Sequence, residues 1–298
     1  MDAIQELEDT VRSTTEACAP SVVSIGRRGR GTGFVVADGR VLTNAHNLRD
    51  RTTEVGFADG RRAQGSLLGS DVDGDLVVLE VDTAGAPALA WADQPAQPGD
   101  VVLAVTAGRH AVRVTWGQVT GSERGFRGPR GRPVHGAIEH TAPAAAGSSG
   151  APVVNRDGGV VGVNTHRLEH GFYLARAADS ELREAVTAMQ SGHRLEPVRL
   201  GVALAAAAHA RQLRRAVGLA DRDGVLVRTV AEGSPAQAAG ITVGDLLVAA
   251  AGRSLSTPDD VFAVLDAVRP GEELSVDLVR GDTEHTVTVS FPERTTDG

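Results

Sequence analysis

The chain lacks lysine, has a single cysteine and carries few aromatic residues. All 30 of its basic residues are therefore arginine, and 38 acidic residues leave the chain with a net charge of −8. The acidic excess is spread over both halves of the chain. Because a net-acidic chain without a basic half repels a phosphate backbone, we do not expect general nucleic-acid binding.

The other absences exclude further classes of protein. Cys18 has no second cysteine with which to form an intrachain disulfide or a metal cage, and we expect neither a metal nor a cofactor. The six Phe, two Trp and one Tyr predict an aliphatic core and are too few for a base-stacking surface. No run approaches the roughly 20 apolar residues of a membrane span, and the acidic first ten residues do not resemble a secretory signal. Taken as a whole gene product, the chain is therefore predicted to be cytoplasmic, with no membrane span.

The length and patterning predict two folded parts. A chain of 298 residues corresponds to about two domains. Residues 1–17 carry apolar residues at helical spacing, and from Ser21 onward short β-branched runs alternate with Gly, Asp and Pro clusters, which is typical of a β-sandwich or barrel. A helix is expected over residues 177–190, with Ser180 as its cap. After a linker at 191–197, mixed strand and helix patterns predict a compact α+β module.

A serine between glycines is the most informative feature. The segment GSSGAPVVN, residues 147–155, places Ser149 on a tight turn that enters a strand, where backbone N–H groups could stabilise an oxyanion. On this pattern alone an ordinary turn is the more common interpretation. A serine nucleophile also needs an imidazole and an orienting carboxylate. His46 follows the strand in VLTNAHN, and Asp75 opens the buried strand in DGDLVVLEV.

Together these segments resemble the HtrA/DegP family of trypsin-like serine proteases. The resemblance rests on GTGFVVADGRVLTNAHN, DGDLVVLEV and GSSGAPVVN in that order, with gaps of 29 and 74 residues between His46, Asp75 and Ser149. The segment from GVLVRTVAEGSPAQAAG to DDVFAVL is similar to the PDZ domain of the family. The fold implied is an all-β, chymotrypsin-like double β-barrel followed by a smaller α+β PDZ domain. The domains implied are a helical segment 1–17, a protease domain 18–190, a linker 191–197, a PDZ domain 198–292 and a tail 293–298.

The resemblance also implies roles for individual residues. Ser149 would be the nucleophile, His46 the general base and then acid, and Asp75 the orienting carboxylate. The backbone N–H groups of Gly147 and Ser149 would form the oxyanion hole. A solvated turn histidine and a surface carboxylate are the alternatives for His46 and Asp75 taken singly.

The substrate pocket departs from the family pattern. Small residues fill TAPAAAG, residues 141–147, where the family has bulkier ones. Pro143 lies six residues before Ser149, at the position of the acid that selects basic substrates in trypsin-like pockets. We therefore expect cleavage after small or medium apolar residues. The pocket residues predicted are Ala144, His166 and Phe172, with His170 nearby; a solvated loop is the alternative for the two histidines.

A segment rich in arginine, residues 109–132, has six Arg and one Glu among Gly and Pro. Such arginines commonly face solvent. We expect a flexible surface loop near the active site, which could serve as a self-cleavage or regulatory element.

In the PDZ domain, the resemblance places a peptide carboxylate at a short loop before the strand VALA. The residues implied are Leu200, Gly201 and Val202, with Gly201 allowing the backbone to approach the carboxylate. The facing wall would come from Val261 and Leu265 on the helix 258–267. Ordinary core packing is the alternative for these two.

The function predicted is a serine endopeptidase that hydrolyses unfolded or misfolded proteins without a cofactor. Its PDZ domain is predicted to bind C-terminal peptides or to regulate the protease when such peptides bind. The alternative is a catalytically idle peptide-binding or chaperone-like protein on the same fold. The family commonly forms trimers through N-terminal aromatic contacts, but the first aromatic residue here is Phe34. A homo-oligomer is therefore a prediction whose size the sequence leaves open.

Overall fold

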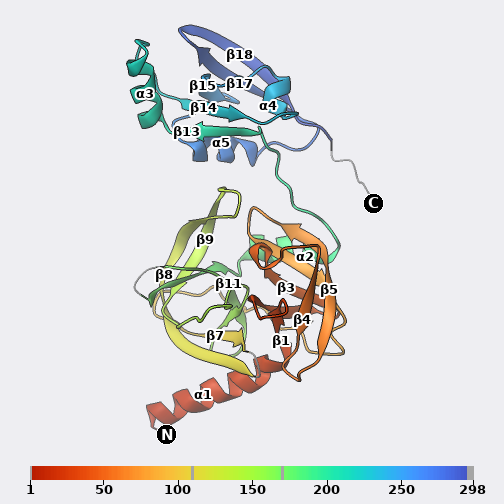
Figure 1. Cartoon of the computed structure of the whole chain (residues 1–298). Helices are drawn as coiled ribbons and strands as arrows, with labels where there is room; N and C mark the ends of the chain where they lie inside the picture. The colour runs from red at the N-terminus through yellow and green to blue at the C-terminus, as the bar shows by residue number, and fades with distance from the viewer. Residues whose placement is uncertain (1, 109–110, 169–170, 294–298) are drawn as a thin grey trace. The chain divides into compact units, whose positions relative to one another are not determined.

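The computed structural model describes residues 2–108, 111–168 and 171–293. The chain divides into two compact units, residues 1–196 and 197–298 (Figure 1). Each unit is described by itself. The expected tail lies largely outside the described residues.

Two closed antiparallel barrels build the first unit. The first barrel has the strand order β1-β2-β3-β6-β5-β4, and the second has the order β10-β11-β12-β9-β8-β7. The first barrel consists of β1 (Val22–Ile25), β2 (Gly31–Ala37), β3 (Arg40–Asn44), β4 (Thr52–Gly56), β5 (Arg62–Asp71) and β6 (Leu76–Glu80). The second consists of β7 (Val101–Ala107), β8 (Val112–Arg127), β9 (Pro133–His140), β10 (Pro152–Val154), β11 (Val160–Arg167) and β12 (Tyr173–Ala177). The predicted double β-barrel is confirmed.

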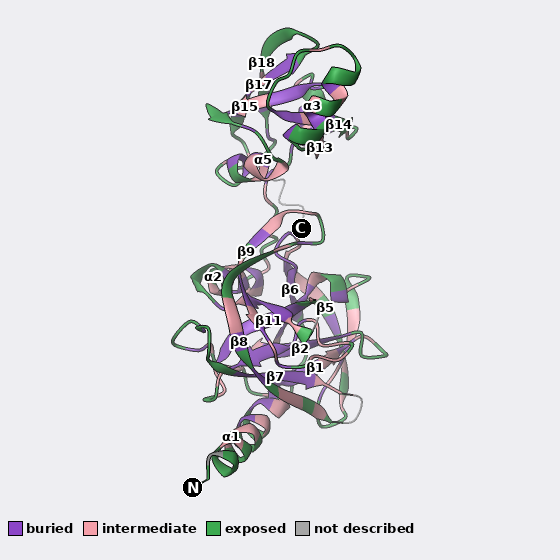
Figure 2. Cartoon of the chain, turned by 90° about the vertical axis from the view of Figure 1, so that its left-hand side faces the viewer, coloured by how far each residue is buried: buried purple, intermediate pink, exposed green. Residues whose placement is uncertain are grey.

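Aliphatic side chains fill the barrels, as the shortage of aromatic residues predicts. Val23, Ile25, Val41 and Leu79 are fully buried in one cluster of the first barrel. A further cluster joins both barrels and includes Phe34, Leu42, Leu76, Leu103 and Val163. In Figure 2 strands such as β6 and β7 are mostly buried, whereas much of β8 and of the N-terminal helix is exposed. Burial of this apolar surface contributes roughly 25 cal/mol per Å² and fixes the contact between the barrels.

Two helices complete the first unit. Helix α1 (Ala3–Cys18) begins at Asp2, whose side chain accepts the Ile4 N–H. Helix α2 (Ser180–Gln190) packs against β5 and β6. Its cap is Asp179, whose Oδ1 accepts the Leu182 N–H at 2.9 Å, so the expected cap at Ser180 is wrong by one residue. Both residue types suit an N-cap, and Ser180 is already helical. No helix of the described chain is long and apolar enough to cross a membrane.

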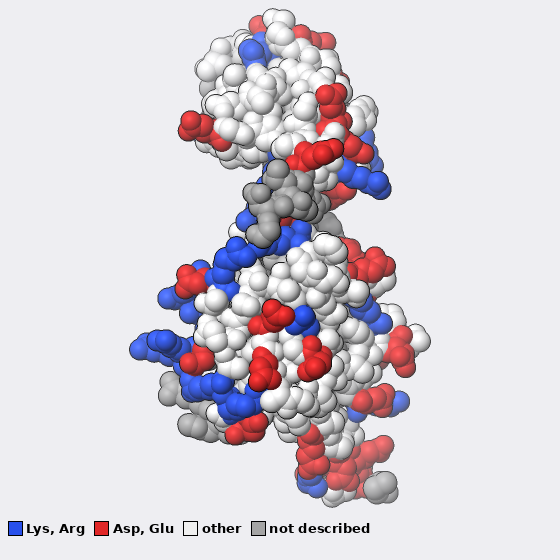
Figure 3. Space-filling model, turned by 90° about the vertical axis from the view of Figure 1, so that its right-hand side faces the viewer, with Lys and Arg blue, Asp and Glu red and all other residues white. Residues whose placement is uncertain are grey.

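The arginine-rich segment is a β-hairpin and not the flexible loop that we expected. Residues 112–127 form β8, which pairs with β9 through Arg124 opposite Ala137 and Phe126 opposite Val134. The guanidinium of Arg124 forms an ion pair with Glu139 at 2.7 Å, because the two strands place these side chains on one face. Residues 109–110 lie outside the described chain. On the face seen in Figure 3, arginines gather along one margin of this unit and acidic side chains lie beside them.

The described residues of the second unit, 197–293, form one sheet and three helices. The strand order is β13-β14-β15-β17-β18, with β16 paired to β15. The strands are β13 (Val202–Ala205), β14 (Val225–Val230), β15 (Leu246–Ala250), β16 (Arg253–Ser254), β17 (Glu273–Arg280) and β18 (Thr283–Ser290). The helices are α3 (Ala207–Ala216), α4 (Pro235–Ala238) and α5 (Pro258–Leu265). Helix α5 begins with a capping box between Thr257 and Asp260.

Candidate active site

Strand pairing brings His46 and Asp75 together. In the β3–β6 pair, Asn44 lies opposite Leu76. His46 follows Asn44 by two residues, in the 3-10 turn η2 (Ala45–Asn47), and Asp75 precedes Leu76 by one. His46 Nδ1 lies 2.7 Å from Asp75 Oδ2, and the His46 backbone N–H donates to Asp75 Oδ1 at 3.1 Å. One carboxylate therefore holds both the backbone and the ring of the histidine.

The carboxylate of Asp75 is buried and accepts a third hydrogen bond. Its side chain is 1% exposed, against 40% for His46. Thr165 Oγ1 donates to Asp75 Oδ2 at 3.2 Å. Because a buried charge without partners would be costly, these three donors replace the water that the carboxylate has lost. The Asp75 carbonyl is also fixed, by Asn44 Nδ2 at 2.8 Å.

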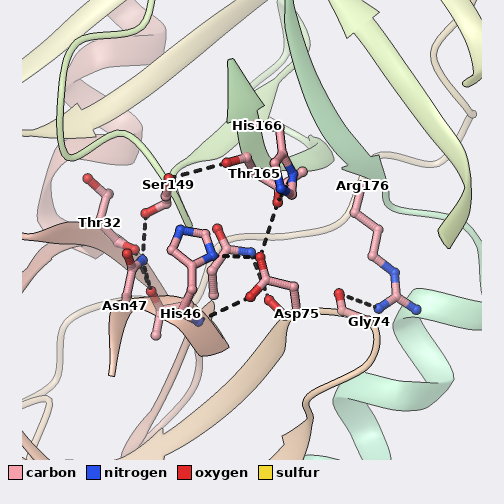
Figure 4. Close-up of polar contacts among 11 residues, drawn as sticks. Thr32, His46, Asn47, Gly74, Asp75, Ser149, Thr165, His166 and Arg176 are labelled. Carbon is pink, nitrogen blue, oxygen red and sulfur yellow. Dashed lines mark hydrogen bonds and ion pairs between the residues drawn. The ribbon is translucent and has the colours of Figure 1, made fainter. Parts of the chain in front are cut away.

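The hydrogen bond to Asp75 sets the tautomer of His46. With its proton on Nδ1, the ring has a free lone pair on Nε2. Figure 4 shows the ring of His46 between Asp75 and Ser149. The arrangement suits a general base that takes a proton from the serine hydroxyl.

Ser149 lies in the turn between β9 and β10, half-buried, and its carbonyl is fixed by the first barrel. The carbonyl accepts the Thr32 N–H at 2.9 Å and the Asn47 Nδ2 at 2.8 Å. Ser149 Oγ donates to the Thr165 carbonyl at 3.2 Å, and within the described residues it forms no hydrogen bond with His46. Rotation about the Cα–Cβ bond of Ser149 would be needed to turn the hydroxyl toward His46.

Two glycines shape this turn. Gly147 and Gly150 have φ angles of +88° and +84°, which L side chains rarely adopt. A Cβ on Gly150 would lie 2.2 Å from the Thr32 carbonyl oxygen. The Gly147 carbonyl accepts Thr32 Oγ1 at 2.7 Å, so Thr32 of β2 binds the turn at the carbonyls of both Gly147 and Ser149.

Two backbone donors of the turn are free. Ser148, Gly150 and Ala151 each donate their N–H to a carbonyl. Across the described parts of the chain, the N–H groups of Gly147 and Ser149 donate to nothing. The unpaired N–H of a serine, together with that of the residue two positions before it, can serve as an oxyanion hole.

Of the three predicted pocket residues, the described contacts link one to the triad. His166 Nδ1 lies 2.9 Å from Thr165 Oγ1, and its ring centroid is 6.4 Å from that of His46. The Phe126 ring of β8 lies 4.8 Å from His166. Ala144 and Phe172 are half-buried, and the Phe172 carbonyl accepts the Leu168 N–H. His170 lies outside the described residues.

Two histidines of the second barrel have lowered pKa values. Burial lowers the pKa of His166; the negative charge of Asp75 opposes this effect, and the nearby His46 adds to it. Burial also lowers the pKa of His140, against the raising effect of its hydrogen bond with Asn164. His140 is fully buried, with Nε2 2.8 Å from Asn164 Oδ1. Both imidazoles therefore favour the neutral form in the folded protein.

Several contacts of the site were not predicted from the sequence. Thr165, Asn47 and Thr32 fix the carboxylate and the serine turn, and Arg176 contacts the loop before Asp75. Thr165 and Asp75 are 90 residues apart, and Asn47 and Ser149 are 102 apart. No spacing pattern in a single sequence signals such long-range contacts. Among the described residues no group of three or more His, Cys, Asp or Glu could hold a metal ion.

In the second unit, the residues of the predicted peptide groove lie in and beside its core. Gly201 has φ +78°, and a Cβ there would meet the Ser234 Cβ at 2.3 Å. Val202 opens β13 opposite Val230. Leu200, Val261 and Leu265 belong to the buried core cluster. Val261 and Leu265 therefore do pack in the core, which was the alternative interpretation of these two residues. Their contact with a peptide stays a prediction.

Comparison with known proteins agrees with both units. Residues 31–163 match the family model of the trypsin-like peptidase domain, and residues 198–291 match that of the PDZ domain. HhoB of Synechocystis sp., named as a serine protease, is 30% identical over 287 residues, covering 89% of this chain and 68% of HhoB. A DegP-like periplasmic serine endoprotease of Marinomonas sp. is 27% identical over 91% of this chain, which spans 58% of that relative.

Solved structures show the same fold. The HtrA-type protease AlgW, crystallised with a decapeptide, has a TM-score of 0.75 and 22% identity, and the match covers 96% of this chain and 99% of AlgW. A serine endoprotease from Yersinia pestis has a TM-score of 0.71 and 24% identity, over 96% of this chain and 98% of that one. The fold and these comparisons together define a trypsin-like serine protease with one PDZ domain. Within that class, the chain belongs to the HtrA family.

Proposed function

We propose that this chain is a serine endopeptidase that hydrolyses unfolded or misfolded proteins through the triad Ser149, His46 and Asp75. One observation carries the proposal. The His46–Asp75 pair, joined at 2.7 Å, lies beside the turn of Ser149, where the N–H groups of Gly147 and of Ser149 itself have no acceptor among the described residues. These are the base, nucleophile and oxyanion donors that acyl transfer requires.

The first half of the proposed reaction acylates Ser149. Its hydroxyl turns from the Thr165 carbonyl toward His46 and attacks the substrate carbonyl carbon, while the proton passes to Nε2 of His46. The oxyanion accepts hydrogen bonds from the N–H groups of Gly147 and Ser149. The C–N bond then breaks, and His46 gives its proton to the leaving amine.

The second half releases the acid. A water molecule attacks the acyl carbon and gives a proton to His46. The tetrahedral intermediate collapses, the bond to Ser149 Oγ breaks, and the proton returns to that oxygen. Asp75 stays ionised throughout and stabilises the imidazolium. Pro143 and the small side chains around Ala144 support a preference for small or medium apolar residues before the cleaved bond.

A second candidate has one specific observation in its favour. Ser149 Oγ donates to the Thr165 carbonyl and not to His46. A protein that kept this conformation permanently would bind peptides without cleaving them. The PDZ unit would then supply the function by capturing C-terminal peptides at the loop of Leu200, Gly201 and Val202.

Labelling with a fluorophosphonate separates the two candidates. We expect the wild-type chain to be labelled at Ser149 and to degrade casein, and Ser149→Ala to lose both properties. The reagent attacks only a serine that a base can activate. Neither labelling nor casein degradation by the folded wild-type protein would favour the idle peptide-binding protein.

A further inference from the structure

Asp75 has an unusual backbone conformation. It is a non-glycine residue with a φ angle of 59°, in the left-handed region that costs energy for side chains other than glycine. The φ angle of Asp75 is the rotation about its N–Cα bond, which follows the peptide bond between Gly74 and Asp75. The orientation of this peptide group therefore helps to set the direction in which the Asp75 carboxylate points. Whatever fixes this peptide group therefore also fixes the carboxylate that orients His46.

An arginine from the other barrel holds this peptide group. Arg176, on β12, donates from Nη1 to the Gly74 carbonyl at 3.0 Å and to Asp71 Oδ2 at 2.8 Å. Asp71 Oδ1 in turn accepts the Gly74 N–H at 2.8 Å. Both polar groups of Gly74 are thus bound by one ion pair. Figure 4 shows the guanidinium of Arg176 beside Gly74, on the side of Asp75 away from His46.

The contact is buried and leaves no free space. The side chains of Arg176 and Asp71 are 9% and 13% exposed. A Cβ on Gly74 would lie 1.9 Å from Arg176 Nη1 and 2.0 Å from Asp71 Oδ2. Buried ion pairs often contribute little to stability compared with apolar residues of the same size, so a role in fixing geometry is the better account of this one.

We propose that Arg176 is a positioning residue for the triad. It holds the carbonyl of the Gly74–Asp75 peptide group so that the carboxylate meets His46, and Asp71 holds the guanidinium in place. It also couples the second barrel, which carries Ser149, to the carboxylate of the first. The proposal rests on the proposed function, and Arg176 acts on Asp75 without touching the substrate.

Steady-state kinetics on a short peptide substrate test this role. Arg176→Met should lower kcat about tenfold or more and change KM little, because a misplaced catalytic group costs rate more than binding. In an Asp75→Asn background the same change should lower kcat no further, because the carboxylate to be positioned is already gone. Equal losses in both backgrounds, or an unchanged kcat in a folded Arg176→Met, would overturn the proposal.

Arg183→Met is the matched control. Arg183, on α2, donates to the Ala178 and Ala92 carbonyls at 2.9 and 2.5 Å and does not contact the triad. It should leave kcat unchanged. If Arg176→Met does not fold, Arg176→Lys keeps the charge but not the paired geometry, and the same loss of kcat is expected.

An NMR measurement tests the role of Arg176 without relying on enzymatic activity. The proton between His46 Nδ1 and Asp75 gives a far-downfield NMR signal when that hydrogen bond is formed. We expect the signal to shift or broaden in Arg176→Met and to be unchanged in Arg183→Met. An unchanged signal in both folded variants would refute the role of Arg176. A wild-type protein without turnover or Ser149 labelling would instead refute the proposed function, with the signal still reporting on Arg176.

Discussion

Thr165 is the residue at which the contacts of the site meet. Its hydroxyl contacts both Asp75 and His166, and its carbonyl accepts the Ser149 hydroxyl. The hydroxyl donates to Asp75, so its oxygen can accept a hydrogen bond from a His166 Nδ1–H. A second imidazole is thereby linked to the catalytic carboxylate through one side chain.

Replacing this hydroxyl should impair catalysis. Thr165→Val keeps the shape and the carbonyl but removes the donor to Asp75, and a hydrogen bond to a charged group is worth about 1.5–3 kcal/mol. We expect kcat to fall about tenfold or more, since part of that energy stabilises the imidazolium. Thr165→Ser is the control and should keep most of the rate. Equal rates for the two variants would contradict the role of the hydroxyl.

His140 should make the protease unit less stable in acid. Its pKa is lowered in the folded state by burial. Below the ordinary value of 6.5, the unfolded chain therefore binds a proton that the folded chain does not. The free energy of unfolding should fall as the pH drops through this value toward the lower folded pKa.

Urea unfolding at a series of pH values between neutral and mildly acidic measures this effect. His140→Gln removes the titrating group, so its stability should fall less steeply over the same range than that of the wild type. His166, whose pKa is also lowered, should account for part of the slope that remains. If the unfolding free energy of the variant and that of the wild type fall equally steeply with pH, His140 does not contribute to the loss of stability in acid.

The three triad residues could be predicted from the sequence, but the residues that hold them in place could not. Ser149, His46 and Asp75 each lie in a contiguous segment whose glycines, small residues and β-branched run are visible in the sequence. Arg176 is indistinguishable in the sequence from a surface arginine, and it reaches Gly74 across 102 residues. Only the closure of both barrels brings the two together.

Among the elements, the turn between β9 and β10 has a strict steric requirement at Gly150. Gly150→Ala would place a Cβ 2.2 Å from the Thr32 carbonyl oxygen at a φ of +84°, so the turn must shift. We expect casein degradation and Ser149 labelling to be lost, because the shift moves the nucleophile and its free N–H donors. Activity assays and the unfolding free energy together measure the outcome.

Gly158→Ala is the matched control for this change. Gly158 has a similar φ of +81°, but its nearest neighbour, Cys18 Sγ, would be 3.8 Å from the new Cβ. It should lose about 1 kcal/mol of stability from the backbone conformation alone and keep its activity. If both variants are active, the close approach of Gly150 to β2 is not essential.

Strand β8 shows most clearly where the secondary structure could not be predicted from the sequence. Alternating runs such as RVTWGQVT identify its first half, but Gly and Arg dominate its second half and predict a loop. The structure continues the strand because β9 supplies partners, with three register shifts along the pair. Tertiary pairing outweighs local β-propensity here.

At the scale of the whole molecule, the hydrogen bonds described for the triad side chains all join residues of the first unit. The second unit has its own core, built from Leu200, Val227, Leu247, Val276 and Phe291 among others. We therefore expect residues 1–196 to fold alone and to hydrolyse a short peptide substrate with the kcat of the full chain.

Residues 197–298 should likewise fold alone, and calorimetry of the full chain should show two separable transitions. A fragment 1–196 that is folded but inactive would show that catalysis needs the PDZ unit. The predicted response of turnover to C-terminal apolar peptides can be measured with the full chain, using the fragment as the control.

The buried end of α1 has a practical consequence. Cys18 is 1% exposed, its Sγ lies 4.0 Å from the Gly158 carbonyl oxygen, and burial raises the pKa of the thiol. Since it is the only cysteine in the chain, a maleimide or disulfide reagent can react with the native protein only when this helix end comes loose. The rate of thiol modification therefore measures how often the end of the N-terminal helix opens, and this measurement needs no engineered label.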